Sequence, residues 1–380
     1  MASRRYDWNS GLVYTETEMA PAVGFSNGPS WVHESPFLHQ SRLITSELGA
    51  PTLKQLAMKQ MLSDQRNLTP ALFSNVPWRI ASHLWDYLHE NGNRTMYMWK
   101  LLSTAYPTEF WKASAYWQER VTPVMPIKDY LGLVNDDSVN WGVALTLATE
   151  FATIPELVQI ANVKNVVALE ISTQWPHLIS DEDNTQITSL ADRIIRTWSE
   201  LSQTSRAFKH IKILKLYGQQ HLTGLTFEYL DSFPSLSALV VGDCKGMISK
   251  PVKRLAATYG WETEKRPRLE RRDEDVGFDE SATVYRCYRG IVGRNEQKQA
   301  SVDQDIPILD FQIGPRYPRS SASVVTVFLR EPSSDVEAAN SVRKRKWTSN
   351  IGTEPRLKER KPVMKNVQGK DIKDLLAEFS

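Results

Sequence analysis

From position 51 onward, apolar residues recur every three or four positions, which is the spacing of amphipathic helices. Thr52 is placed to cap the first of these helices, and Trp117 falls on the apolar side of the last. The helices are expected to begin at or near four positions, namely Pro51, Pro77, Thr95 and Thr108. The pattern predicts a helical module over residues 51–125, after a mostly irregular segment 1–50.

After Trp141 short apolar runs alternate with helical stretches, which favours an α/β fold. Three runs share the form apolar-x-x-Leu-x-apolar and are centred on Leu169, Leu214 and Leu239, with a weaker run centred on Leu145. The last two centres lie 25 residues apart, and Leu169 lies 45 residues before Leu214, close to two such units. Three later stretches alternate enough to be strands, namely 281–292, 306–313 and 323–330.

Residues 142–260 resemble a short, degenerate leucine-rich repeat array, because an L-x-x-L-x-L strand with a period of 20–29 residues is the signature of that family. Cys244 extends the match, since it lies where the family places Asn or Cys. An ordinary open parallel sheet with crossover helices is the alternative. On either interpretation, an α/β domain is expected over 140–330. The resemblance implies a concave sheet face that contacts protein partners through Ala168, Glu170, Lys212, Lys215, Ser237 and Val240.

The stretch that begins at Pro77 resembles the opening helix of an F-box, in which a proline precedes aliphatic residues at helical spacing. Trp78-Arg79 replaces the acidic residue that the family carries after the proline. An F-box ahead of leucine-rich repeats is the arrangement of the substrate adaptors of cullin ubiquitin ligases. The resemblance implies that a Skp-type adaptor protein is bound by Pro77, Ile80, Leu84 and Leu88.

Charge is distributed unevenly, although the net charge is only +2. Residues 341–380 hold eleven basic and five acidic residues, a net charge of +6, and residues 250–272 hold eight basic and three acidic, a net charge of +5. The rest of the chain therefore carries −9. Two basic runs stand out, Lys265, Arg266 and Arg268 in one and Arg343, Lys344, Arg345 and Lys346 in the other.

These basic runs predict nuclear import or nucleic-acid binding, with a solvated charge run as the alternative. Nucleic-acid binding ranks below import, because neither aromatic interleaving nor zinc-finger spacing accompanies the basic residues. The protein is therefore expected to be intracellular, and nuclear or nucleocytoplasmic. Residues 331–369 are polar and basic and are expected to be disordered, whereas 370–380 return to helical spacing and predict a short amphipathic helix.

Composition removes several classes of protein. The chain has 41% apolar and 24% charged residues, which is typical of globular proteins, and no apolar stretch long enough to predict a membrane span. Met1-Ala2-Ser3-Arg4-Arg5 leads into no apolar core of a secretion signal, and two cysteines exclude a disulfide scaffold. No spacing typical of a catalytic triad, zinc site or phosphate loop is present, so no catalytic residue, metal or cofactor is expected.

The leading prediction is a non-enzymatic protein-interaction adaptor, a substrate-recognition subunit of a cullin-type ubiquitin ligase. The alternative is a nuclear scaffold or nucleic-acid-associated protein that uses segments 265–272 and 343–346. Five tryptophans between positions 78 and 117 bear on the first prediction. They either line a binding groove or pack short helices together, and packing is the more common use.

Overall fold

The structure is a computed structural model, and its described part covers most of the first 330 residues. The described residues are 2–6, 13–17, 31–38, 52–110, 116–173, 188–263, 283–298, 306–316 and 325–330, with only the backbone described for 2–6, 13–17 and 293–298. Both basic runs, the tail 331–369 and the segment 370–380 lie outside them. The segment expected to be irregular contains an antiparallel pair of strands, β1 (Ala2–Tyr6) and β2 (Val13–Thr17).

Helices at three of the four predicted places are confirmed. Thr52 caps the first in a capping box with Gln55, and Thr95 caps the third by accepting a hydrogen bond from Met98 N at 3.3 Å. Within the described residues this module contains α1 (Leu53–Leu62), the 3-10 turn η3 (Gln65–Asn67), α2 (Pro70–Phe73), α3 (Trp78–Glu90), α4 (Met96–Ala105) and α5 (Pro107–Phe110).

The predicted helix that contains Trp117 is wrong. Of the described residues in this stretch, only the four of α5 are helical, and the next described segment is strand β3 (Tyr116–Arg120). β3 pairs in parallel with β9 (Ile308–Ile313), which lies far along the chain, and this long-range pairing overrides the local helical spacing. The helical module therefore ends before β3, and the sheet begins within the stretch assigned to that module.

An eight-stranded sheet forms the second part of the fold, with the strand order β3-β9-β4-β5-β6-β7-β10-β8. Neighbours from β3 to β7 pair in parallel, whereas β10 runs antiparallel to both β7 and β8. The predicted mixed α/β fold with a mostly parallel sheet is thus confirmed. The remaining strands are β4 (Gly142–Ala148), β5 (Val166–Ser172), β6 (Ile213–Tyr217), β7 (Ala238–Gly242), β8 (Glu262–Thr263) and β10 (Val325–Leu329).

The four leucines at the centres of the predicted runs stand side by side across the sheet. Leu145 pairs with Leu169, Leu169 with Leu214, and Leu214 with Leu239. The 45 residues between the centres of β5 and β6 are close to two units of the predicted spacing, but β5 and β6 are direct neighbours in the sheet. No strand of the sheet therefore lies between them. Each of these leucines is fully buried, so the row is the centre of the core on one face of the sheet.

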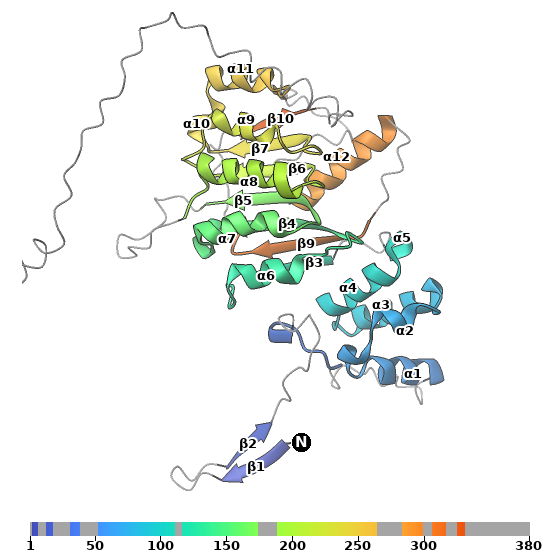
Figure 1. The fold of residues 1–380 in the computed structure, drawn as a ribbon. Helices are drawn as coiled ribbons and strands as arrows, with labels where there is room; N and C mark the ends of the chain where they lie inside the picture. The colour runs from blue at the N-terminus through green and yellow to red at the C-terminus, as the bar shows by residue number, and fades with distance from the viewer. Residues whose placement is uncertain are drawn as a thin grey trace, which may run out of the picture. The chain divides into compact units, whose positions relative to one another are not determined.

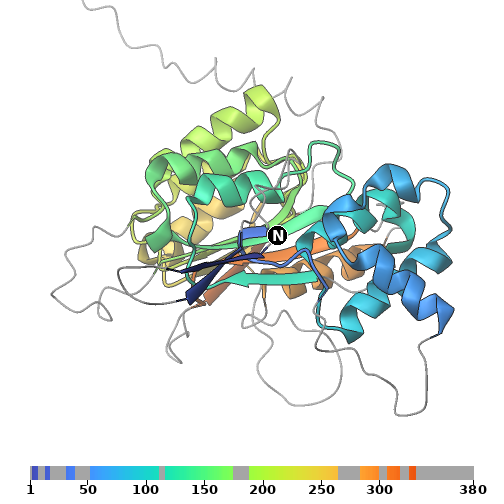
Figure 2. The same ribbon diagram turned by 90° about the horizontal axis from the view of Figure 1, so that it is seen from below.

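Helices cover both faces of the sheet (Figures 1 and 2). The first face is covered by α6 (Ile127–Val134), η4 (Thr149–Phe151), α7 (Ile154–Gln159), η5 (Ile160–Asn162), α8 (Asp192–Ser205), α9 (Leu225–Leu230), α10 (Lys245–Ile248) and α11 (Lys250–Thr258). The second face is covered by α12 (Val284–Lys298), where a strand was predicted. Among the described residues, no helix is long and apolar enough to cross a membrane.

Candidate functional site

The four residues assigned to adaptor binding do not share one exposed surface. Pro77 and Ile80 are exposed, Ile80 by 57%, but Leu84 and Leu88 are buried. Leu84 and Leu88 lie on the face of α3 that packs into the core together with Ala81 and Trp85. In this conformation only Pro77 and Ile80 of the four assigned residues can meet a partner, so the assignment of Leu84 and Leu88 to the contact is corrected.

Other apolar side chains of the helical module do point to solvent. Leu53, at the start of α1, is 83% exposed. Leu62 is the buried residue of that helix. Five large apolar side chains on α1, α2 and α3 are exposed, namely Leu53, Leu56, Met61, Leu72 and Ile80. Exposed apolar side chains of this kind mark an interaction surface where they lie next to one another.

The second face of the sheet, where partner contacts were predicted, is buried. Of the six assigned residues, only Lys212 is even half-exposed, because Ala168, Glu170, Lys215, Ser237 and Val240 are all buried. Four residues of α12 pack against the amino-terminal half of this face, namely Val284, Cys287, Tyr288 and Ile291. An exposed concave face made of these six residues is therefore wrong, since five of them are buried, and of the six only Ala168 belongs to the cluster that packs on α12.

A row of polar side chains crosses this second face at one level of the strands. The register places Glu119 beside Gln312, Gln312 beside Thr146, Thr146 beside Glu170, and Glu170 beside Lys215. Lys215 Nζ lies 3.2 Å from Glu170 Oε2, and Gln312 Nε2 donates to Glu119 Oε1 at 2.8 Å. A buried ion pair of this kind is weak evidence for stability, but removal of one partner is costly.

Asp310 lies on the same face, in the register position beside Trp117. Its side chain is 5% exposed, and no hydrogen bond or ion pair to it is found in the described part of the chain. Burial raises the pKa of Asp310 to about 7, with Arg316 and Lys215 acting against this effect and Glu170 adding to it. This carboxyl group therefore changes its protonation near neutral pH.

Polar side chains just beyond the strands hold neighbouring turns together. Gln219, after β6, donates from Nε2 to Tyr217 O at 2.8 Å and to Thr173 Oγ1 at 2.7 Å. Cys244, after β7, donates from Sγ to Gly242 O at 3.2 Å and contacts Leu216 O of the preceding strand at 3.6 Å. Gln219 and Cys244 thus satisfy main-chain carbonyls at corresponding places, each five positions after the central leucine of its strand.

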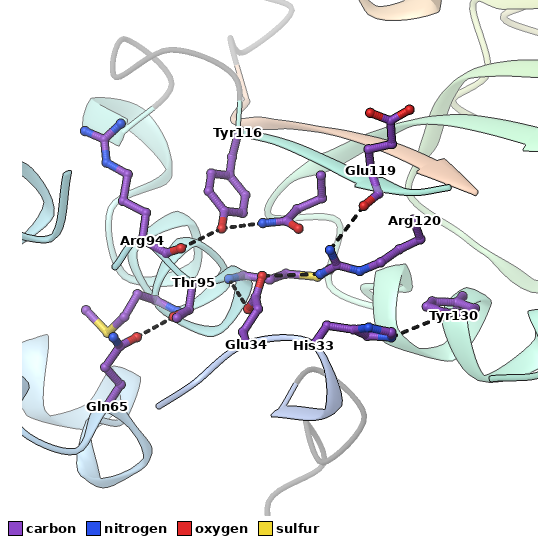
Figure 3. A network of polar contacts seen from close by, with 12 residues as sticks. His33, Glu34, Gln65, Arg94, Thr95, Tyr116, Glu119, Arg120 and Tyr130 are labelled. Carbon is purple, nitrogen blue, oxygen red and sulfur yellow. Dashed lines mark hydrogen bonds and ion pairs between the residues drawn. The ribbon is translucent and has the colours of Figure 1, made fainter. Parts of the chain in front are cut away.

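A second polar network joins the helical module to the sheet (Figure 3). We call it the junction: it consists of residues 31–38, Met96 at the start of α4, Arg120 on β3 and Tyr130 on α6. Glu34 accepts hydrogen bonds from Met96 N at 2.7 Å and from Arg120 Nη2 at 3.5 Å. Burial raises the pKa of Glu34 to about 7, although both donors favour its charged form.

His33 completes the junction on the side of the sheet. Its Nε2 lies 2.9 Å from Tyr130 Oη, and the two rings stack with centroids 5.6 Å apart. Burial and the charge of Arg120 lower the pKa of His33, so the neutral ring is favoured. Sequence patterns missed the junction, since residues 31–38 have no periodicity; the adjacent His33 and Glu34 were the available signal.

The second face of the sheet and the junction contain packing contacts and groups that bind or release protons, namely Asp310, Glu34 and His33. Within the described ranges, no group of three or more His, Cys, Asp or Glu side chains is placed to hold a metal ion. Burial raises the pKa of the Cys244 thiol to about 12, which keeps it protonated and unreactive at neutral pH. Asp310 in its alternating run was a signal that sequence analysis did not use.

Comparisons with known proteins found no relative of this chain. No family model, no curated protein and no solved structure matches it. Function is therefore inferred from the residues and their geometry, with the two basic segments 265–272 and 343–346 outside the described residues.

Proposed function

We propose that the protein is a non-enzymatic interaction adaptor, a substrate-recognition subunit of a cullin-type ubiquitin ligase. Its helical module would dock on a Skp-type adaptor protein, and its sheet domain would carry the surface that recognises a second protein. A nuclear or nucleocytoplasmic location is part of this proposal and rests on the basic runs of the sequence. The nuclear scaffold or nucleic-acid-associated alternative depends on those runs alone.

The observation that carries the proposal is the set of outward apolar side chains on α1, α2 and α3. Leu72 and Ile80 are each 57% exposed, on either side of the turn that leads through Pro77 into α3. Exposed aliphatic side chains contribute about 1.5–3 kcal/mol each when a partner buries them fully. The module therefore offers an apolar contact surface while its own core remains closed around Leu84 and Leu88.

Two features of the sheet support the second half of the proposal. The aligned leucines of β4, β5, β6 and β7 give successive units the same core position, and Gln219 and Cys244 occupy corresponding turns. The aligned core position is a property of repeat arrays, and Cys244 fits their pattern, whereas Gln219 departs from the Asn or Cys of the family. Because five of the six residues first assigned to recognition are buried, recognition would use other surfaces.

Co-purification with a Skp-type adaptor tests the proposal. Ile80→Asp should reduce association at least tenfold, because a charge would replace an apolar contact at the surface of α3. Ile154→Asp is the matched control, since Ile154 on α7 is 59% exposed, close to the 57% of Ile80. Association that is absent in the wild type, or lost equally in both variants, would remove the ubiquitin-ligase role.

A further inference from the structure

Residues 31–38 are held in place almost entirely by side chains and main-chain groups from elsewhere in the chain. Glu34 bonds to Met96 N, 62 positions away, and His33 contacts Tyr130, 97 positions away. The segment has no strand or long helix of its own, only a short 3-10 turn at its start and an isolated bridge between Phe37 and Asp64. It therefore lies on the protein as a bound peptide lies on its receptor.

A carboxyl group lies at the centre of this contact. α4 has no acidic residue in its own first turn, and Glu34 supplies a carboxylate oxygen to the N–H of Met96, where the helix dipole favours negative charge. Arg120 reaches the other oxygen of the same carboxyl group, and the side chain of Arg120 is only 15% exposed. Without Glu34, a mostly buried guanidinium group and a helix N-terminal N–H would both lose this partner.

Aromatic residues hold the two ends of the segment. Trp31 packs on Tyr97 with ring centroids 5.2 Å apart. Phe37 lies under the guanidinium group of Arg66, 4.8 Å from the ring centroid, and its carbonyl accepts from Asn93 Nδ2 at 3.1 Å. Between them, Gln65 N donates to Pro36 O at 3.0 Å. These contacts thus involve the side chains of Trp31, Glu34 and Phe37, which are spaced three residues apart. They also fix the main chain between them.

We infer that the surface that holds residues 31–38, formed by η3, the start of α4, β3 and α6, is a peptide-binding site and that residues 31–38 occupy it in cis. Its ligand class is a short peptide with an aromatic residue, an acidic residue three positions later and a second aromatic residue three positions after that, as in Trp31, Glu34 and Phe37. A segment of another protein with the same chemistry would compete with residues 31–38 for the site. This inference is independent of the proposed adaptor function.

The test uses the full chain with its own segment weakened, in the triple variant Trp31→Ala, Glu34→Ala, Phe37→Ala. The probe is a fluorescein-labelled synthetic peptide of residues 31–38, added in trans and followed by fluorescence anisotropy. It should bind the triple variant saturably and bind the wild-type chain at least tenfold more weakly, because there the site is occupied. A peptide with Glu34→Ala should bind the triple variant at least tenfold more weakly than the unchanged peptide.

The control peptide carries Ser35→Ala, because the hydroxyl of Ser35 bonds only to Phe37 within the same segment in the described contacts, and it should bind like the unchanged peptide. If the triple variant is unfolded by circular dichroism, the peptide should restore its folded signal. No binding to a folded triple variant, or no restoration of an unfolded one, would show that residues 31–38 are an integral part of the fold and would overturn the inference. Equal binding of the Glu34→Ala peptide would overturn the stated ligand class.

Discussion

At the scale of single residues, the buried carboxyl group of Asp310 couples folding to pH. Burial raises its pKa from an ordinary value of 3.8 to about 7, so the folded state prefers the protonated form. A group with a raised pKa contributes its full stability below the unfolded pKa, and that contribution is lost as pH rises through the folded value. We expect Asp310→Asn to be more stable than the wild type at pH 8, by on the order of 3 kcal/mol, and nearly equal to it at pH 4.

Urea denaturation at a series of pH values measures this difference. The control is Asp137→Asn, because Asp137 is exposed and the pKa of its carboxyl group is lowered, chiefly by the hydrogen bond to Lys164. Any effect of that substitution on the pH dependence has the opposite sign. A difference between Asp310→Asn and the wild type that stays constant from pH 4 to pH 8 would show that Asp310 is not buried as described.

At the scale of elements, α12 decides whether the second face of the sheet is a surface or a core. Val284 at its start is fully buried against Ala144 and its neighbours, whereas Arg286, two positions later, is exposed. We expect Val284→Asp to lower the free energy of unfolding by about 3 kcal/mol or more, because it buries an unpaired charge. Arg286→Asp should change it by less than about 0.5 kcal/mol. Chemical denaturation followed by circular dichroism compares them, and similar effects would contradict the packing of α12.

The same elements explain what the sequence could predict. The core row Leu145, Leu169, Leu214 and Leu239 was predicted because apolar spacing within a strand is a local signal. β3 and α12 were assigned wrongly because their states depend on long-range partners: β3 pairs with β9, and α12 packs across β4, β5 and β6. Local spacing around Trp117 carries no information about β9, which lies nearly two hundred positions later.

The candidate site residues also divide into those with a local sequence signal and those that depend on long-range contacts. Glu170 and Lys215 were singled out as alternating positions of strands, but alternation alone could not predict that both are buried in the folded chain. Ile80 was found, while Leu84 and Leu88 were assigned to the wrong side, because one helical stripe can face either the core or a partner. The junction had no periodic signal at all, since its contacts join residues that lie 62 to 97 positions apart.

At the scale of the whole molecule, direct contacts join the helical module to the sheet domain, and one cluster of buried apolar residues runs through both. Trp99 of α4 packs edge-to-face on Trp141 with ring centroids 5.2 Å apart. Two side chains also donate across this boundary, Tyr116 Oη to Arg94 O and Lys100 Nζ to Leu133 O, each at 3.0 Å. These contacts couple the two parts, so we expect the wild type to unfold in a single calorimetric transition.

The variant Tyr116→Phe, Lys100→Met removes both hydrogen bonds but keeps the aromatic ring and the apolar stem. It should lose about 2 kcal/mol and lower the transition midpoint by about 5 °C, with a broader transition as the two parts begin to unfold separately. The control is Tyr229→Phe, Lys128→Met, whose side chains lie on helices α9 and α6 of the sheet domain. Two separate transitions in the wild type would mean that the junction and the Trp99–Trp141 contact do not couple the helical module to the sheet, whereas one transition that only the first variant broadens would establish that they do.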